Sequence, residues 1–392
     1  MPARHPLATE GSESVAAPLA QVRELQRRFT QWLATQALPR WALQGWEAER
    51  GFQERLAAGG PVHADPRRAR VQVRQVYAFA YASELGWRGD PEPLVRGGLA
   101  LFLQRYRRRD RLFRTLCSAD GTPLDERAFL YDQAFVLLAL AASRRVLGAQ
   151  GAFSAEAQAL LATLQRLLKR GGPGFYSGLP ERLPLLANPH MHLLEAALAW
   201  REIDAAPAWQ QLVSEISELA LRHLIDGGSG ALLESFDEDW RRRGDAAGRT
   251  IEPGHLFEWA WLLLRAGGPA QQQAAVRLIE IGEQHGVRSG VALNALLDDF
   301  TVQDAQARLW PQTERLKANA RLAITRPQCW QAVAQAGATL MRYLDVQPAG
   351  LWRDRLTAEG TFVAEPAPAS TLYHLVAAAL ELQGALAAAA PR

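Results

Sequence analysis

The sequence predicts an all-α protein folded as an (α/α)6 barrel, a closed ring of six helical hairpins. Two observations lead to this prediction. Alanine and leucine are abundant, β-branched residues are sparse, and apolar residues recur with the helical period. In addition, polar residues that interrupt apolar segments recur at a nearly constant distance along the chain.

The helical period is clearest in six segments, which are expected to form helices: 25–38, 134–147, 155–168, 192–203, 255–266 and 372–386. The strings Asn188-Pro189 and Glu252-Pro253-Gly254 lie just before helical stretches and are typical helix start signals. No long segment alternates apolar and polar residues, so strands are expected only as short pieces in loops such as 230–236.

Six polar residues mark the repeat, and the distances between them are 58, 60, 63, 59 and 60 residues: Arg74, Asp132, His192, His255, Glu314 and His374. A repeat of this length holds two helices of about 20 residues with ordinary loops. Each marked residue therefore lies at the same point of a helix pair. A closed ring and an open solenoid would both place the six residues along one surface, and the prediction is the ring.

No linker divides the 392 residues, so residues 13–392 are expected to form one domain, preceded by a disordered segment at 1–12. The two cysteines, Cys117 and Cys329, support neither a disulfide framework nor a cysteine metal site. The N-terminal segment lacks the apolar core of a signal peptide, and the longest apolar run, 134–142, is too short to span a bilayer. These features predict a cytoplasmic protein.

The charges are balanced, with 44 Lys and Arg against 41 Asp and Glu and a net charge of +3. This balance gives no field directed at nucleic acid or at a membrane, and neither is expected as a partner. The one dense basic run, 105–111, is interpreted as a solvated face, with a phosphate contact as the weaker alternative.

Three of the eight histidines fall at the same phase of the repeat. His192 is expected in the first turn of its helix, with Asn188 as its cap. His190 and His192 are two residues apart and point in different directions on a helix, so they make a poor metal pair. His374 is likewise expected near a helix start, capped by Ser370 or by its neighbour at 371. The shared phase favours a functional role over three unrelated core histidines.

His255 and Glu258 are three residues apart and share one helical face. A carboxylate beside an imidazole can orient the ring and tune its pKa, although a buried ion pair that only positions the helix is the alternative. The spacing is not that of the H-E-x-x-H zinc proteases. Arg74 lies on an otherwise apolar helix face and therefore needs a partner or a pocket.

The chain lacks a G-x-G-x-x-G fingerprint after a strand, a P-loop and a G-x-S-x-G elbow. Nucleotide cofactors and serine hydrolase chemistry are therefore not expected. Tyr131, beside Asp132, opens one apolar helix, and Trp310 precedes Glu314 in another.

Six ordered strings resemble the N-acylglucosamine 2-epimerase family, which also contains mannose isomerases, sulfoquinovose isomerases and cellobiose 2-epimerases. They are RVQVRQVYAFAYASELGW, LYDQAFVLLALA, NPHMHLLEAALAW, EPGHLFEWAWLLL, RLWPQTERLKA and ASTLYHL, and they extend from about residue 70 to 375. The family fold is an (α/α)6 barrel. The resemblance implies that His255 and His374 are the catalytic acid/base pair, and that the sugar site is lined by Arg74, Asn188, His192 and Glu258, with Tyr131 and Trp310 as weaker members.

The resemblance implies an isomerase that acts on a small free sugar without a metal or another cofactor, as a monomer or homodimer. A base would remove the C2 proton of the open-chain aldose, and Arg74 and an imidazolium would stabilise the enediol. His192 is a candidate helper for ring opening. Proton return to C1 gives a ketose, and return to the opposite face of C2 gives the epimer.

The strings NPHMHLLEA and RLWPQTE favour the mannose isomerase branch, so the leading expectation is conversion of D-mannose to D-fructose. N-acylglucosamine 2-epimerisation is the main alternative, with glucose–mannose epimerisation behind it, and a phosphorylated substrate stays open. An inverting glycoside hydrolase would need two carboxylates about 6.5–9.5 Å apart, drawn from Asp132, Glu258 and Glu314. A non-catalytic sugar-binding or protein-binding scaffold is the other remote alternative.

Overall fold

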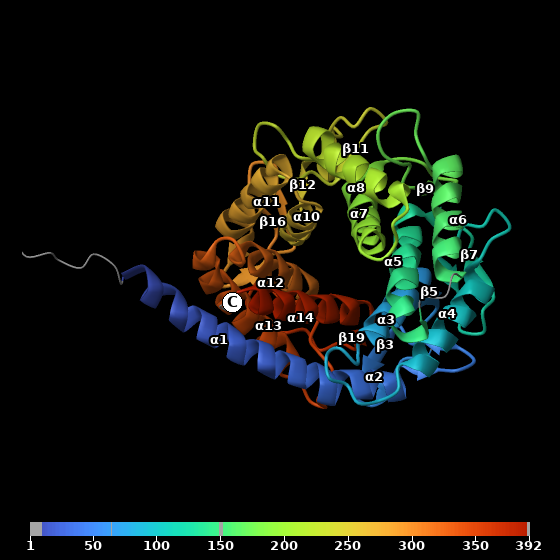
Figure 1. Cartoon of the computed structure of the whole chain (residues 1–392), viewed down its shortest axis with the longest axis horizontal. Coiled ribbons are helices and arrows are strands. Elements are labelled where there is room, and N and C mark those ends of the chain that lie inside the picture. Colours follow the sequence, from blue (N-terminus) through green and yellow to red (C-terminus); the bar gives the residue numbers. More distant parts are fainter. Residues whose placement is uncertain (1–9, 64, 149–151, 390–392) are drawn as a thin grey trace, which may run out of the picture.

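Two concentric layers of helices build the computed structural model, which describes residues 10–63, 65–148 and 152–389 (Figure 1). The inner layer consists of α3 (Ala69–Ala80), α5 (Leu130–Leu147), α7 (Ala187–Arg201), α10 (Pro253–Ala266), α12 (Leu309–Ala323) and α14 (Ser370–Ala388). Each inner helix contacts the next one in chain order, and α14 contacts α3. The ring is therefore closed, which confirms the predicted (α/α)6 barrel.

The outer layer covers the spaces between inner helices and consists of α1 (Glu10–Trp32), α4 (Glu92–Tyr106), α6 (Ala152–Leu167), α8 (Pro207–Leu219), α11 (Pro269–Ile281) and α13 (Trp330–Leu344). These helices are amphipathic, and α13, for example, buries Trp330, Val333, Leu340 and Tyr343 on one side. The inner helices are buried nearly all round, because the outer layer covers one side and the barrel interior lies on the other.

Shorter helical segments extend or connect these elements. They are η1 (Leu33–Ala37), α2 (Leu38–Gln44), η2 (Ala220–Leu224), α9 (Ala246–Arg249), η3 (Gly282–Gly286) and η4 (Pro327–Cys329).

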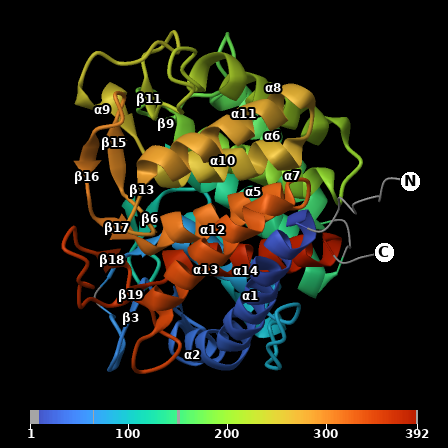
Figure 2. The ribbon, with the colours of Figure 1, turned by 90° about the vertical axis from the view of Figure 1, so that its left-hand side faces the viewer.

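A short strand precedes every inner helix with at most one residue between them, and these strands gather on one side of the molecule (Figure 2). In chain order they are β5 (Arg67–Arg68), β8 (Ala128–Phe129), β10 (Leu185–Leu186), β12 (Thr250–Ile251), β17 (Ala307–Arg308) and β19 (Ala367–Pro368). All six inner helices therefore begin at the same end of the barrel. Residues in their first turns are brought together there, although they are about 60 positions apart in the sequence.

Further strands in the loops pair antiparallel with these strands or with one another. They are β3 (Arg55–Ala57), β4 (Gly60–Pro61), β6 (Leu116–Cys117), β7 (Pro123–Asp125), β9 (Gly178–Leu179), β11 (Ser235–Phe236), β15 (Ala295–Leu297), β16 (Val302–Asp304) and β18 (Arg355–Leu356). The resulting sheets have the orders β5-β6-β7, β8-β9, β10-β11, β12-β15-β16, β17-β18 and β19-β3-β4. Two further pairs are local: β1 (Trp46–Glu47) with β2 (Gly51–Phe52), and β13 (Val287–Arg288) with β14 (Val291–Ala292).

Side-chain amides tie these loops to the inner helices in a repeated way. Three glutamines each accept a hydrogen bond from the backbone N–H of a residue 20 positions earlier and donate one to the carbonyl of the same residue. They are Gln72, Gln133 and Gln312, and the donor–acceptor distances are 2.8–2.9 Å. A glutamine amide thus satisfies a buried backbone donor and acceptor that no strand neighbour reaches. Gln72 and Gln312 lie two residues before the repeat markers Arg74 and Glu314.

Three of the predicted helices, 134–147, 255–266 and 372–386, lie within observed ones. The predictions 155–168 and 192–203 run one and two residues beyond the ends of α6 and α7, and 25–38 continues through η1 into the start of α2. Of the segment 1–12 that was expected to be disordered, residues 1–9 lie outside the described residues, and residues 10–12 belong to α1. Within the described ranges no helix is both long and apolar enough to cross a bilayer.

Candidate active site

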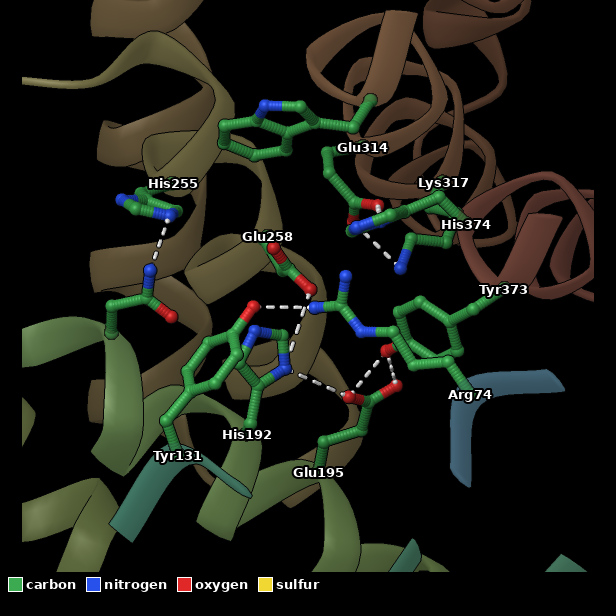
Figure 3. Close-up of polar contacts among 12 residues, drawn as sticks. Arg74, Tyr131, His192, Glu195, His255, Glu258, Glu314, Lys317, Tyr373 and His374 are labelled. Carbon is green, nitrogen blue, oxygen red and sulfur yellow. Dashed lines mark hydrogen bonds and ion pairs between the residues drawn. The ribbon is translucent and has the colours of Figure 1, made fainter. Parts of the chain in front are cut away.

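The first turns of the inner helices surround one pocket of about 260 Å³. Its lining includes all eight residues proposed from the sequence, together with six others: Arg68, Arg70, Arg74, Tyr131, Asn188, His192, Glu252, His255, Glu258, Arg308, Trp310, Ser370, Thr371 and His374. Ligand pockets span roughly 300–1,000 Å³, so this volume suits a small molecule rather than a polymer. Figure 3 shows Arg74, Tyr131, His192, His255, Glu258 and His374 converging from different helices.

The repeat markers divide into two groups around this pocket. Four of the markers line the pocket: Arg74, His192, His255 and His374. The other two, Asp132 and Glu314, are fully buried behind the pocket. Asp132 pairs with Arg70 at 3.3 Å, and Glu314 contacts His374 and Lys317. The two buried carboxylates therefore support pocket residues instead of facing the pocket.

His374 is held as a neutral imidazole. Its Nδ1 lies 2.7 Å from Oε1 of Glu314, so the ring donates from Nδ1 and keeps a lone pair on Nε2, on the side of the pocket. Burial lowers the pKa of His374 well below its ordinary value, and the nearby charges of Arg74 and Lys317 lower it further. A neutral imidazole with a free Nε2 is the form that acts as a general base.

His255 is held in the opposite protonation state. Its Nδ1 lies 3.0 Å from Oε2 of Glu234 and 3.6 Å from Oε2 of Glu252. Burial opposes a charge on this ring, but the two carboxylates outweigh it and raise the pKa of His255 to about 10. His255 is therefore an imidazolium near neutral pH and can donate a proton. The ring of Trp310 lies between the two histidines. Its centre is 5.1 Å from the ring centre of His255 and 5.8 Å from that of His374.

The side-chain amide of Asn188 agrees with a protonated His255. Asn188 Nδ2 lies 3.2 Å from His255 Nε2, while its buried Oδ1 has no hydrogen-bond partner among the described residues. Nitrogen and oxygen of an amide are assigned from the hydrogen-bond network, and the exchanged assignment lets Oδ1 accept from the Nε2–H of an imidazolium. The expected cap was wrong, because α7 begins at Ala187 after the N-cap Leu186, and Asn188 faces the site instead.

The expected pairing of Glu258 with His255 was also wrong. Glu258 Oε1 lies 3.9 Å from Nδ1 of His192, and the carboxylates that hold His255 are Glu234 and Glu252. Burial and the neighbouring charge of Glu314 raise the pKa of Glu258 well above its ordinary value. Glu258 is thus a pocket-lining carboxyl group with a strong preference for the neutral form.

His192 is a buried neutral imidazole, which lies below His255 and His374 in the view of Figure 3. Its Nδ1 lies 3.2 Å from Oε2 of Glu195, which also accepts a hydrogen bond from the hydroxyl of Tyr373. Burial lowers the pKa of His192 to about 4. Tyr373 therefore orients Glu195 and, through it, His192.

Arg74 brings a positive charge into the pocket that no carboxylate of the described residues neutralises. Its Nη2 donates to the hydroxyl of Tyr131 at 2.5 Å, and its guanidinium lies 4.1 Å from the ring centre of Phe135. Tyr373 also stacks on it, with its ring centre at 5.1 Å. A guanidinium held by aromatic rings keeps its charge available for an oxyanion.

The helix that carries His374 begins without the expected cap. Its N-cap is Ala369, and neither Ser370 nor Thr371 caps it. Thr371 instead donates to Asp354 at 3.3 Å, while Ser370 lines the pocket. The strand β19 fixes the start of α14, so a side-chain cap is not needed to define it.

In the part of the chain that the structure describes, three groups of acidic and imidazole side chains have oxygen or nitrogen atoms within 4.8 Å of one another that could bind a metal ion: His192 with Glu195 and Glu258, Glu234 with Glu252 and His255, and Glu258 with Glu314 and His374. A protein donor already engages one carboxylate in each group. Tyr373 donates to Glu195, the His255 imidazolium contacts Glu234, and Lys317 Nζ lies 2.6 Å from Glu314 Oε2. These donor sets do not fit a cation, and we assign no metal site to them.

His190, in contrast to His192, has a structural role. It takes the place of the loop-binding glutamines: the N–H of Phe175 donates to its Nε2 at 3.0 Å, and its Nδ1 contacts the carbonyl of Leu186 at 2.8 Å. Burial lowers the pKa of His190 to about 4, so the ring is neutral.

We expect His190→Ala to lower the free energy of unfolding by about 1–3 kcal/mol, because it leaves a buried backbone N–H without a partner. Urea unfolding checks this value. His190→Gln, which restores the group used in three other repeats, should lose less. A large loss of turnover by either folded variant, without a loss of stability, would contradict a structural role.

Comparison with known proteins agrees with this geometry. A family model for N-acylglucosamine 2-epimerase (GlcNAc 2-epimerase) matches residues 51–378. The chain is 45% identical over 370 residues to a Rhizobium meliloti (strain 1021) protein named mannose-6-phosphate isomerase, covering 91% of this chain and 96% of that protein.

Two solved structures share the fold. Cellobiose 2-epimerase from Spirochaeta thermophila DSM 6192 has a TM-score of 0.84 at 21% identity, covering 94% of this chain and 98% of that one. A D-mannose isomerase has a TM-score of 0.80 at 17% identity, covering 97% of this chain and 100% of that one. With the family model matched over most of its length, the chain belongs to the N-acylglucosamine 2-epimerase family and is an isomerase of the sugar isomerase and epimerase group.

Proposed function

We propose that this protein interconverts a mannose-type aldose and the corresponding 2-ketose, D-mannose and D-fructose in the simplest case. The observation that carries the proposal is a pair of histidines in opposite protonation states on one small pocket. His374 is neutral with a free Nε2, and the pKa of His255 is raised to about 10. Proton transfer between neighbouring carbons needs one base and one acid at neutral pH.

In the proposed reaction, His374 removes the C2 proton of the open-chain aldose. The C–H electron pair forms the C1–C2 double bond, and the carbonyl electrons move to O1, which takes a proton from His255. His255 then removes the O2 hydroxyl proton, the C2 carbonyl forms, and C1 takes the proton held by His374. The product is the ketose, and both histidines return to their starting states. Arg74 stabilises the negative charge that develops on oxygen.

Ring opening precedes this step and uses the same groups. The cyclic sugar requires a proton on its ring oxygen and loss of the proton on O1. His255 can supply the first, and a neutral imidazole such as His192 can accept the second. Before the isomerisation step, His255 takes up a proton again and His192 releases one, both by exchange with solvent. Epimerisation at C2 would require an acid on the opposite face of C2, so the distance from His255 to that carbon decides between the two outcomes.

A substrate phosphorylated at O6 is a second candidate, favoured by the arginines around the pocket. Besides Arg74, its lining contains Arg68, Arg70 and Arg308, whose side chains are between 31% and 42% exposed. Arg68 contacts Glu54 through Nε, and Arg308 contacts Asp354 through Nε and Nη2. Among the described residues, this leaves Nη1 and Nη2 of Arg68 and Nη1 of Arg308 without an ion-pair partner. A relative with 45% identity is named mannose-6-phosphate isomerase.

Comparison of kcat/KM for D-mannose, D-mannose 6-phosphate and N-acetylmannosamine tests these proposals. A ketose product from either mannose substrate supports isomerisation, and a preference for the phosphate supports a role for the arginines. Arg308→Gln should then raise KM for the phosphate and leave KM for free mannose nearly unchanged. Turnover of N-acetylmannosamine alone would instead support a 2-epimerase.

The pocket does not favour an inverting glycoside hydrolase. Of the three carboxylates considered for that reaction, only Glu258 lines the pocket, while Asp132 and Glu314 are buried behind it. Two carboxylates that flank a glycosidic bond are required for that chemistry. The volume of about 260 Å³ also favours a single sugar unit.

The pH profile of kcat/KM offers a test of the acid. The imidazolium of His255 is required, so activity should fall as the pH rises through its pKa of about 10. Glu234→Gln removes one carboxylate and lowers that pKa, so the basic limb should move to lower pH by about 1–3 units. The acidic limb should stay in place, because His374 has no contact with Glu234. An unmoved basic limb would contradict the assignment.

A further inference from the structure

Lys317 is a buried cation close to the pocket but outside its lining. The chain has only two lysines, Lys169 and Lys317, although Lys and Arg together number 44. Lys317 is fully buried, its Nζ lies 2.6 Å from Oε2 of Glu314, and it stacks on Trp261 with 3.7 Å to the ring centre. A buried ammonium is costly unless it is paired, so its position requires a reason.

A continuous chain of contacts connects this ammonium to the base. One carboxylate oxygen of Glu314 faces Lys317, and the other lies 2.7 Å from Nδ1 of His374 (Figure 3). All three groups are almost completely excluded from water. A change of charge at Lys317 is therefore only weakly screened and acts directly on the Glu314–His374 pair.

We propose that Lys317 is a positioning residue that neutralises the charge of Glu314 and so keeps Nε2 of His374 free of a proton. This role rests on the proposed function, in which His374 is the base. Without Lys317, the Glu314–His374 pair would bind one additional proton. If the additional proton is on the imidazole, His374 becomes an imidazolium. If it is on the carboxyl group, Glu314 donates a hydrogen bond to Nδ1 of His374, and the ring proton then resides on Nε2. Either placement blocks the base.

The contrast with His255 supports this role. Both histidines contact carboxylates through Nδ1, yet only His374 remains neutral. Glu314 has the ammonium of Lys317 at 2.6 Å, whereas Glu234 has no lysine or arginine within 4.0 Å among the described residues. A cation behind the carboxylate is thus one difference between the two sites, beside the second carboxylate, Glu252, at His255.

Other charged groups also surround His374 and Lys317. They are Arg74 from α3, His192 and Glu195 from α7 and Glu258 from α10. Arg74 is a second cation that lowers the pKa of His374, but among the described residues no ion pair joins it to Glu314. Burial opposes the charge of Lys317, but the carboxylates Glu314, Glu258 and Glu195 outweigh it and raise the pKa of the ammonium. Lys317 therefore stays charged over the pH range in which the enzyme would work.

Lys317→Met tests the proposal through the pH profile of kcat. The acidic limb, which reports protonation of the base, should move to higher pH by about 1–3 units. In the double variant Lys317→Met/Glu314→Gln, the pair no longer binds the extra proton, and the limb should return toward its original position. Lys169→Met, which also removes a lysine from a contact with a glutamate, is the matched control and should leave the limb unchanged.

A merely structural role predicts different results. In that case Lys317→Met would lower kcat by the same factor at every pH, or the double variant would keep the limb where the single variant has it. Either outcome would overturn the proposal. The single variant could fail to fold because it leaves Glu314 without its buried partner, whereas the double variant buries no unpaired charge. In that case the double variant is compared with the wild type alone, and a shifted acidic limb would overturn the proposal.

A measurement without substrate separates this proposal from the proposed function. Nitrogen-15 NMR of histidine-labelled wild-type protein, assigned with His374→Gln, should show His374 neutral at pH 7 with its proton on Nδ1. A protonated Nε2 would overturn the role of Lys317. Absence of turnover with all three sugars would instead reject the proposed function and leave this NMR result standing.

Discussion

His374→Gln should lower kcat by about 10²–10⁴-fold, the range that a positioned general base contributes. The variant removes the free Nε2 lone pair but keeps a side chain that can contact Glu314. KM should change little, because the substrate is still bound by the remaining pocket residues. Turnover of mannose or its phosphate, measured by the appearance of the ketose, checks the prediction.

The control for this variant is His285→Gln, which changes a half-buried histidine stacked on Phe300 outside the pocket. It should retain normal turnover. Exchange of the C2 proton with solvent deuterium should also disappear in His374→Gln, since His374 is the base proposed to remove that proton. A variant that retains activity within about tenfold of the wild type would contradict the role of His374, given the contribution expected of a general base.

His255→Gln should have an effect of similar size, about 10²–10⁴-fold on kcat, because it removes the proton donor for O1. The difference from His374→Gln lies in the pH dependence. The basic limb near the pKa of about 10 should be absent in His255→Gln, whereas the acidic limb of the base should remain. Profiles of kcat/KM between pH 5 and 11 distinguish the two variants.

Asn188 provides the companion test for His255. Its amide contacts Nε2 of His255 at 3.2 Å without carrying a charge. Asn188→Ala should therefore reduce activity less than His255→Gln and leave the basic limb in place. If His255→Gln retained the wild-type basic limb, another group would be the acid, and the role proposed for His255 would be wrong.

The fold could be predicted from the sequence because the barrel repeats. One helical hairpin occupies about 60 residues, and each contributes a polar side chain near the start of its inner helix. This period survives even though the repeats share few other residues. The short strands that precede the inner helices carry no such signal. Each has only two residues, too few for an alternating pattern to be visible.

The pocket lining could be predicted from the repeat and from the family resemblance, but the charges that set its chemistry could not. Glu234 reaches His255 from a loop 21 residues away, and no periodicity relates the two positions. The spacing of His255 and Glu258 instead suggested a pair that the structure does not contain. Lys317 was open to prediction, because it follows Glu314 by three residues on one helical face.

Local rules for helix caps were misleading at this end of the barrel. Asn188 and Ser370 are good capping residues near helix starts, yet each lies inside the first turn and faces the pocket. The preceding strands already determine where the inner helices begin. Polar residues at these positions are therefore available for ligand binding, which a rule based on local sequence does not reveal.

Proton NMR of the wild-type enzyme with D-mannose in D2O, after treatment with a chelator, is the most direct test of the proposed isomerisation, and D-mannose 6-phosphate is the parallel substrate. We expect the ketose, fructose or its 6-phosphate, as the first product, formed without added metal. Glucose or its phosphate as the first product would contradict the isomerase and indicate 2-epimerisation. No conversion of either sugar would contradict the assignment of a mannose-type substrate.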